Sequence, residues 1–199
     1  MDRNVVVIDA GSGAAESPSA VFSLLRGAGI VLAGSALVAV CAHVAIPLWF
    51  TPVPVTMQPF AVILLGLLLG PQLAAGTMLA YLVEGAAGLP VFTPHGLGGV
   101  AQLLGPTGGY LLSYSVVAPM VSMLWRAGAR GFSRGLIVAG AGSLVTLAMG
   151  AVWFGMGTHT PPMTVLNHAV LPFLPGEVLK VCAAAGIAAG VSRPRRQNG

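Results

Sequence analysis

Charged side chains are scarce in this chain of 199 residues, where they make up only 7% of the sequence. Soluble domains carry about a quarter charged residues because their surface faces water. Asp, Glu, Lys and Arg are absent from residues 27–83, 85–125 and 135–176. A membrane-spanning helix needs about 20 apolar residues, so each stretch is long enough for two spans and their connection. With 56% apolar side chains and a mean hydropathy of +0.89, the sequence predicts a polytopic membrane protein.

Other scarcities exclude further classes of function. A single lysine, Lys180, provides little with which to neutralise a nucleic-acid backbone. Cys41 and Cys182 lie in apolar segments and fit neither a disulfide framework nor a zinc spacing. The phosphate-binding pattern G-x-x-x-x-G-K-[ST], the nucleophile pattern G-x-S-x-G and the metal spacing H-E-x-x-H are all absent. We therefore expect no nucleic-acid partner, no metal site and no cofactor, and we expect binding or transport rather than catalysis.

Proline, glycine and polar clusters divide the apolar sequence into segments of helical length. We predict an all-α integral membrane protein with six transmembrane helices, at residues 28–46, 60–69, 72–87, 110–124, 136–154 and 175–191. Four prolines between positions 47 and 59 exclude a continuous helix through the first connection. A loop rich in glycine and proline follows the third span, and a polar loop follows the fifth.

The positions of the arginines predict the orientation in the membrane. They fall before the first span, between the fourth and fifth spans, and after the sixth: Arg3, Arg26, Arg126, Arg130, Arg134, Arg193, Arg195 and Arg196. Positively charged loops stay in the cytoplasm, so we expect a multi-pass protein of the cell membrane with both termini cytoplasmic. We divide the chain into a disordered cytoplasmic tail at 1–26, a six-helix membrane domain at 27–192 and a basic cytoplasmic tail at 193–199.

Three charged residues, Glu84, Glu177 and Lys180, remain near or within membrane depth on the extracellular half. An unpaired charge at the bilayer centre costs roughly 2.5–3.5 kcal/mol, so such residues are candidates for a functional site. Glu177 and Lys180 are three residues apart and share a helix face. They either bind a ligand that has an anionic group and N–H donors, or form an ion pair that anchors the helix at the interface. Glu84 contacts either the ligand or water.

Aromatic residues flank the outer ends of the predicted spans. They form either the aromatic belt of the membrane interface or the wall of a pocket. Our candidate substrate-binding residues are Glu177, Lys180, Glu84, Tyr81, Tyr110, Phe92 and Gln58.

Three blocks of sequence resemble a known family. They are TPVPVTMQPFAVILLGLLLGP at 51–71, YLVEGAAGLPVF at 81–92 followed by LLGPTGGYLL at 103–112, and PFLPGEVLK at 172–180. In this order they resemble the BioY proteins, the biotin-specific substrate-binding subunits (S components) of energy-coupling-factor (ECF) transporters. The resemblance covers about residues 28–192.

The resemblance implies a six-helix bundle whose outward pocket is closed by the loops after helices one, three and five. It implies high-affinity capture of biotin, with transport energised by a transmembrane coupling protein and two ATP-binding subunits, which fits the missing phosphate-binding pattern. The family's PGD-x-x-K contacts to biotin map onto Glu177 and Lys180, with Glu in place of Asp. Some relatives carry an arginine where this chain has Leu111. The docking pattern A-x-x-x-A of helix one is replaced by a small-residue face of Ser35, Ala39 and Ala42.

Two questions stay open at this point. Lys180 meets either the carboxylate or the ureido oxygen of biotin, and the neighbouring Glu177 favours the ureido end because it accepts N–H donors. The alternative functions are an S component for another water-soluble vitamin, such as thiamine or riboflavin, and a structural membrane subunit without a small-molecule ligand.

Overall fold

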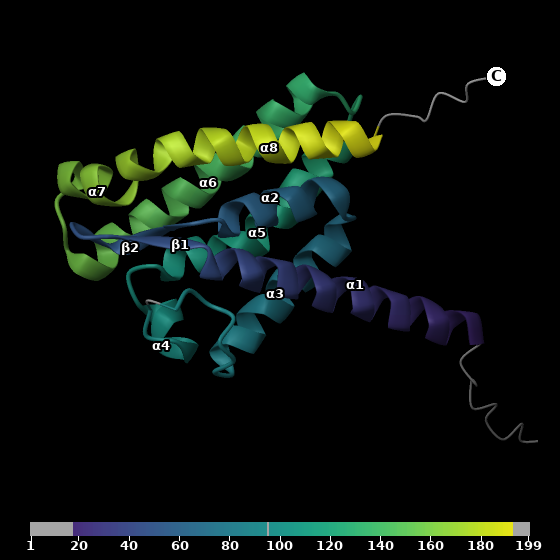
Figure 1. Cartoon of the computed structure of the whole chain (residues 1–199), viewed down its shortest axis with the longest axis horizontal. Coiled ribbons are helices and arrows are strands. Elements are labelled where there is room, and N and C mark those ends of the chain that lie inside the picture. The colour runs from purple at the N-terminus through teal and green to yellow at the C-terminus, as the bar shows by residue number, and fades with distance from the viewer. Residues whose placement is uncertain (1–17, 95, 193–199) are drawn as a thin grey trace, which may run out of the picture.

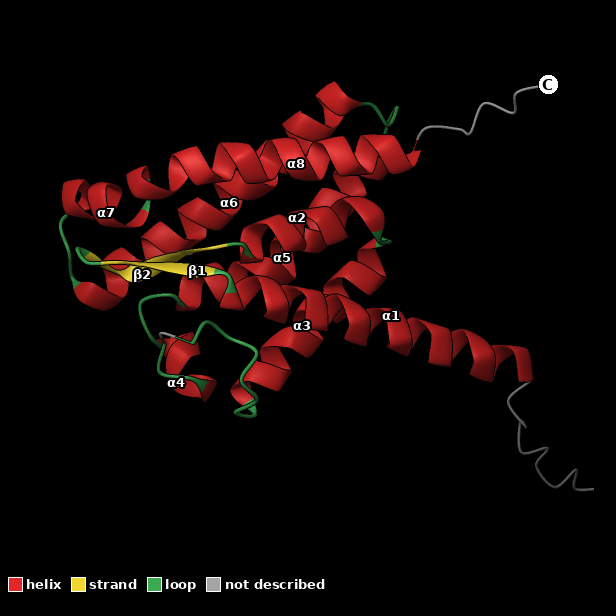
Figure 2. Cartoon of the chain, in the orientation of Figure 1, coloured by secondary structure: helices red, strands yellow, loops and turns green. Residues whose placement is uncertain are grey.

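Helices form almost all of the ordered architecture (Figures 1 and 2). The computed structural model describes residues 18–94 and 96–192. The longer helices are α1 (Pro18–His43), α2 (Gln58–Leu68), α3 (Pro71–Ala86), α5 (Gly108–Arg126), α6 (Phe132–Thr158) and α8 (Leu174–Ser192). Shorter elements are the strands β1 (Ala45–Leu48) and β2 (Thr51–Thr56), the helices α4 (Gly99–Leu104) and α7 (Pro162–Ala169), and the 3-10 turn η1 (Leu171–Phe173).

Helix α2 is the centre of the bundle. Eight of its 11 residues are buried, and it packs against α1, α5, α6 and α8. Pro59 stands in its first turn, where a missing N–H costs nothing. The helix ends before Gly70-Pro71, and Pro71 then begins α3. A short helix that is apolar apart from Gln58 is therefore enclosed by longer ones.

Close contact between helices depends on glycine at two positions. A Cβ on Gly66 of α2 would lie 2.8 Å from the carbonyl oxygen of Ala118 on α5. A Cβ on Gly142 of α6 would lie 2.7 Å from a methyl group of Val121. Small residues at such crossings let membrane helices gain van der Waals contact, so α5 packs tightly against α2 on one side and α6 on the other.

An antiparallel hairpin follows α1. β1 pairs with β2, and the backbone N–H of Met57 donates to the carbonyl of Val44 at 3.1 Å, which closes the hairpin onto the end of α1. The prolines exclude a helix here, and a two-stranded ribbon tolerates them because both of its strands are edges. The sequence predicted a non-helical connection, which the structure contains, but it did not predict strands.

Each of the six predicted spans overlaps one helix, but α1 begins earlier than expected, and the expected end of the first span at 45–46 lies in β1. Residues 18–26, assigned to the tail, belong to α1, while 1–17 and 193–199 lie outside the described residues. By length and hydropathy, three helical stretches are sufficient to cross a membrane: Val21–His43, Phe132–Thr158 and Pro162–Ser192. The helical fold class is confirmed, whereas the number of crossings stays a prediction.

The two ends of the bundle differ in character (Figure 1). The start of α1, the α2–α3 turn, the α5–α6 connection and the end of α8 lie at one end. Arg26, Arg126 and Arg134 belong to these elements. The hairpin, α4 and α7 lie at the other end, where the polar residues of the site gather.

Candidate functional site

A polar cavity lies at the hairpin end of the bundle. It has a free volume of about 40 Å³ and is lined from β2, α2, α4, α5, α6, η1 and α8 and from the connections beside them. The lining residues are Val53, Pro54, Thr56, Gln58, Pro59, Thr93, Gln102, Thr107, Tyr110, Leu111, Tyr114, Thr146, Leu147, Phe173, Glu177 and Lys180. Segments distant in the sequence therefore meet around one small space.

Glu177 and Lys180 form the charged side of the cavity. Lys180 Nζ lies 2.7 Å from Glu177 Oε1, and each residue is only 5% exposed. Ser143 of α6 donates to Glu177 Oε2 at 2.6 Å. Both carboxylate oxygens thus have a hydrogen-bond partner. Lys180 uses one of its three N–H donors on Glu177, which leaves two for a ligand. An interfacial anchor would extend its charged group into water, whereas this pair is buried against the cavity.

Aromatic rings form the middle of the cavity wall. Tyr110 and Phe173 lie with ring centroids 6.3 Å apart, and Tyr114 is 2% exposed beside them. The hydroxyl of Tyr110 donates to the carbonyl of Ala169 at the end of α7. Gly150 of α6 leaves room for the Tyr110 ring, because a Cβ there would overlap it. Tyr110 of α5 is consequently hydrogen-bonded to the end of α7.

A chain of hydrogen bonds crosses the base of the hairpin. Thr56 donates to Gln58 Oε1 at 3.1 Å, and Gln58 Nε2 donates to the hydroxyl of Tyr81 at 2.6 Å. Tyr81 donates in turn to the carbonyl of Val91 at 3.1 Å. These hydrogen bonds connect β2, α2, α3 and the connection after α3. They therefore hold in place β2, α2 and this connection, which all contribute to the cavity wall.

The opposite wall contains two buried polar atoms without a hydrogen-bond partner, Thr93 Oγ1 and Gln102 Nε2. Thr93 is 6% exposed and Gln102 is 2% exposed. Buried polar groups are nearly always hydrogen-bonded, and an unpartnered one costs about 1–3 kcal/mol. Both residues line the cavity, so both atoms are placed to meet whatever enters it.

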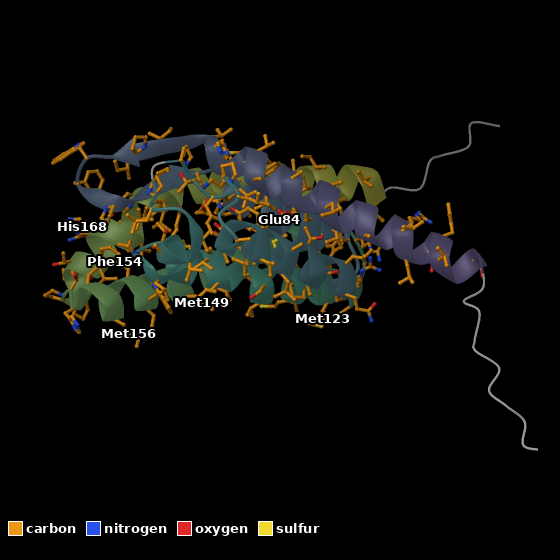
Figure 3. The ribbon with its side chains drawn as sticks, turned by 90° about the horizontal axis from the view of Figure 1, so that it is seen from below. Glu84, Met123, Met149, Phe154, Met156 and His168 are labelled. Atoms are coloured by element: carbon orange, nitrogen blue, oxygen red, sulfur yellow. The ribbon has the colours of Figure 1, made fainter. Side chains whose placement is uncertain are left out.

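Four of the seven expected substrate-binding residues line the cavity: Glu177, Lys180, Tyr110 and Gln58. Tyr81 lies behind Gln58, and Phe92 packs on Tyr81 with ring centroids 5.3 Å apart. Glu84 lies outside the cavity lining and accepts a hydrogen bond from Ser35 of α1. Figure 3 shows Glu84 beside α1, distant along the molecule from His168 at the hairpin end.

The expected docking face on α1 points mainly inward. Ser35 and Ala42 are 0% exposed, and Ala39 packs against the core. Helix α1 does expose other small residues, among them Gly29, Ala33 and Ala36. Apolar residues occur on all sides of α1, so the sequence carried no pattern to separate its inner face from its outer face.

The sequence analysis missed four residues of the cavity lining, Thr93, Gln102, Tyr114 and Thr146, and it also missed Ser143, which donates to Glu177. Ser143 and Thr146 are three apart within an apolar helix, and this spacing places two hydroxyl groups on one face. Gln102 is the one amide in the run GGVAQLLG. Isolated polar residues in apolar surroundings were the available signal. Across residues 18–94 and 96–192, no group of three or more His, Cys, Asp or Glu is placed to hold a metal ion.

Comparison with known proteins gives one consistent result. The BioY family model matches residues 15–197. A probable biotin transporter BioY of Pyrococcus horikoshii is 37% identical over 137 residues, covering 69% of this chain and 79% of that protein. The biotin transporter BioY2 of Lactococcus lactis is 33% identical over 151 residues, covering 76% and 81%.

Structural comparison agrees with these relatives. The crystal structure of the S-component for biotin from an ECF-type ABC transporter matches with a TM-score of 0.77 and 26% identity, covering 89% of this chain and 95% of that one. The family expected from the three sequence blocks is confirmed: the chain belongs to the BioY family.

Proposed function

We propose that this chain is the biotin-binding membrane subunit, the S component, of an ECF-type transporter, and that it is not an enzyme. The observation that carries the proposal is the buried Glu177–Lys180 ion pair. It lines the cavity, and two N–H donors of Lys180 remain available to a ligand. Burying two charges is costly and adds little stability compared with apolar packing. We attribute the presence of this costly ion pair to ligand recognition. In a member of the BioY family, the pair would bind a polar group of the transported substrate.

The chemistry of biotin matches the groups around the cavity. Its ureido ring has two N–H donors and a carbonyl acceptor, its sulfur-containing ring and chain are apolar, and its far end is a carboxylate. Glu177 accepts N–H groups, and the two remaining donors of Lys180 meet an acceptor. Tyr110, Tyr114 and Phe173 provide apolar contact for the rings.

Biotin binding requires the cavity to widen. Pockets that hold drug-sized ligands have volumes of roughly 300–1,000 Å³, against about 40 Å³ here. Three segments cover the cavity: the β1–β2 hairpin, the connection carrying α4, and the segment of α7 and η1. They are the segments that move apart to admit the ligand, while the longer helices hold Glu177 and Lys180.

The membrane arrangement follows from the bundle. We place all six longer helices across the bilayer, with both chain ends and the arginines in the cytoplasm. Helix α2, at about 16 Å, reaches only half of the roughly 30 Å hydrocarbon core, and the hairpin completes its path. The cavity at the N-terminus of α2 then lies within the outer half of the membrane.

The partners of an S component are a transmembrane coupling protein and ATP-binding subunits. We assign docking to the outward face of α1, where Gly29, Ala33 and Ala36 are exposed. Small residues allow the close helix contact that membrane interfaces need. This face replaces the expected set of Ser35, Ala39 and Ala42.

The test is a binding screen on the purified full chain in detergent. Tritiated biotin, thiamine and riboflavin are titrated in parallel, and thermal unfolding is followed with each vitamin. We expect saturable binding of biotin and a rise in melting temperature with biotin alone. Binding of thiamine or riboflavin without biotin would select the other-vitamin alternative. A protein that no vitamin binds or stabilises would be a structural subunit.

A further inference from the structure

The cavity has a second polar side that carries no charge on any described residue. Three buried side-chain atoms lack a hydrogen-bond partner among the described residues, and two of them, Thr93 Oγ1 and Gln102 Nε2, line this cavity. The third is Arg134 Nε, at the opposite end of the bundle. Unsatisfied polar atoms are thus concentrated where a ligand enters.

The orientation of the Gln102 amide is determined by its neighbour. The backbone N–H of Gly98 donates to Gln102 Oε1 at 3.2 Å. A backbone N–H only donates, so the atom it meets is the amide oxygen. The remaining NH₂ group therefore presents N–H donors, and Thr93 adds a hydroxyl that also donates. This side of the cavity is built to meet an acceptor.

These two residues and the charged pair line the same cavity from different elements of the bundle. Glu177 and Lys180 belong to α8, whereas Gln102 belongs to α4, and Figure 1 shows α8 and α4 on opposite sides of α2 and α5. A ligand that contacts both sides must have two polar ends joined by an apolar middle.

A second cavity adjoins this side. Thr93, Gln102, Pro54 and Thr107 also line a space of about 210 Å³, whose other walls include Pro52 and Leu97. Thr93 and Gln102 thus stand between the inner cavity and a larger outer one. An anionic group held here keeps part of its hydration, so it needs no buried cation to offset desolvation.

We propose that Gln102 and Thr93 form an uncharged subsite that binds the carboxylate of biotin, with the ureido ring at Glu177 and Lys180. This inference rests on the proposed function. It assigns Lys180 to the ureido oxygen and gives the carboxylate two neutral donors.

The experiment compares biotin with biotinamide, in which the carboxylate becomes a neutral amide. Affinities are measured by titration calorimetry on the purified full chain and on the variants Gln102→Leu and Thr93→Val. Gln72→Leu makes the same chemical change at an exposed position of α3 away from the cavity. Thermal unfolding of each variant reports folding.

We expect Gln102→Leu to weaken biotin binding about 10–100-fold, because hydrogen bonds to charged groups are the stronger ones. Biotinamide should lose only about 2–10-fold. Thr93→Val should act in the same direction, and Gln72→Leu should change neither ligand. If Gln102→Leu does not fold, Thr93→Val decides the question.

Failures are distinguishable. If the unaltered chain binds no biotin, the proposed function is wrong. If it binds biotin but the folded variants keep both the affinity and the preference over biotinamide, the subsite is wrong and ordered water satisfies these atoms. If Lys180→Met removes the preference while Gln102→Leu keeps it, the carboxylate lies at Lys180 and the inference is overturned.

Discussion

Ser143 of α6 donates a hydrogen bond of 2.6 Å to Oε2 of Glu177 on α8. Oε1 of the same carboxylate is held by Lys180 at 2.7 Å. The carboxylate is therefore fixed from two helices, and its orientation is set before a ligand arrives. Such preorganisation lowers the cost of binding, because fewer groups have to be ordered by the ligand.

Ser143→Ala tests this fixation. The variant frees Oε2, so we expect biotin affinity to fall about 3–10-fold, while the loss of one hydrogen bond costs about 1 kcal/mol of stability. The matched control is Ser113→Ala, which removes a buried hydroxyl that donates to the carbonyl of Tyr110 on its own helix, outside the cavity lining. Equal affinity losses in both variants would contradict a specific role for Ser143.

Lys180→Met separates recognition from stability. Removing one partner of a buried pair costs about 3–5 kcal/mol, whereas replacing both partners with apolar residues is often neutral. We expect the single variant to lose high-affinity biotin binding and to melt at lower temperature. The double variant Glu177→Leu, Lys180→Met should recover most of the melting temperature and still bind no biotin. A double variant that binds biotin normally would make the pair purely structural.

Gly150→Ala tests the position of the Tyr110 ring. A Cβ at this position overlaps the ring, so Tyr110 must move, at a cost of about 1–3 kcal/mol. We expect faster release of biotin in a dissociation assay, because Tyr110 also holds the end of α7. Gly140→Ala on the same helix meets no atom within 4 Å and should be neutral or stabilising by about 0.5–1 kcal/mol. Similar behaviour of the two variants would rule out the contact.

Tyr81→Phe removes the centre of the hydrogen-bond chain from Thr56 to Val91. Gln58 Nε2 then loses its acceptor, and the carbonyl of Val91 loses its donor. We expect a loss of about 1–3 kcal/mol in stability and faster exchange of biotin, since the connection after α3 is released. Melting temperature and the dissociation rate measure the two effects. If neither the melting temperature nor the dissociation rate changes, these hydrogen bonds do not restrain the connection after α3.

Glu84→Gln addresses a residue that the sequence analysis placed among the substrate-binding candidates. Glu84 lies outside the cavity lining, and its side chain is bonded to Ser35. The amide of Gln retains an acceptor for Ser35, so we expect the equilibrium affinity for biotin to stay unchanged. A clear loss of affinity in a stably folded variant would return Glu84 to the site.

Helix positions were predictable from this sequence because its breaks are chemically distinct. Pro71 and the glycine-rich stretch before Tyr110 cannot continue an apolar helix, and the longer helices after α1 begin within a few residues of the expected places. The hairpin was not predictable in the same way. Prolines in TPVPVT argue against an ordinary strand, and pairing depends on the partner segment at Ala45.

Side-chain direction was the harder problem. Glu177 and Lys180 were identifiable because a charge in an apolar segment needs a partner or a ligand. Gln102 was missed because a six-residue helix in a loop gives no periodicity from which its direction can be inferred. The burial of Ser35 and Ala42 was not predictable, because a helix that is apolar on every side contains no inward or outward signal.

Because the only lysine in the sequence is buried beside the cavity, its reactivity can be used to follow the opening of the cavity. An amine-reactive reagent can acylate a lysine side chain of this chain only at Lys180, and we expect this buried amine to react faster when the segments over the cavity move apart. The mass gained at this residue over time therefore measures how often the closed cavity opens, without any introduced label.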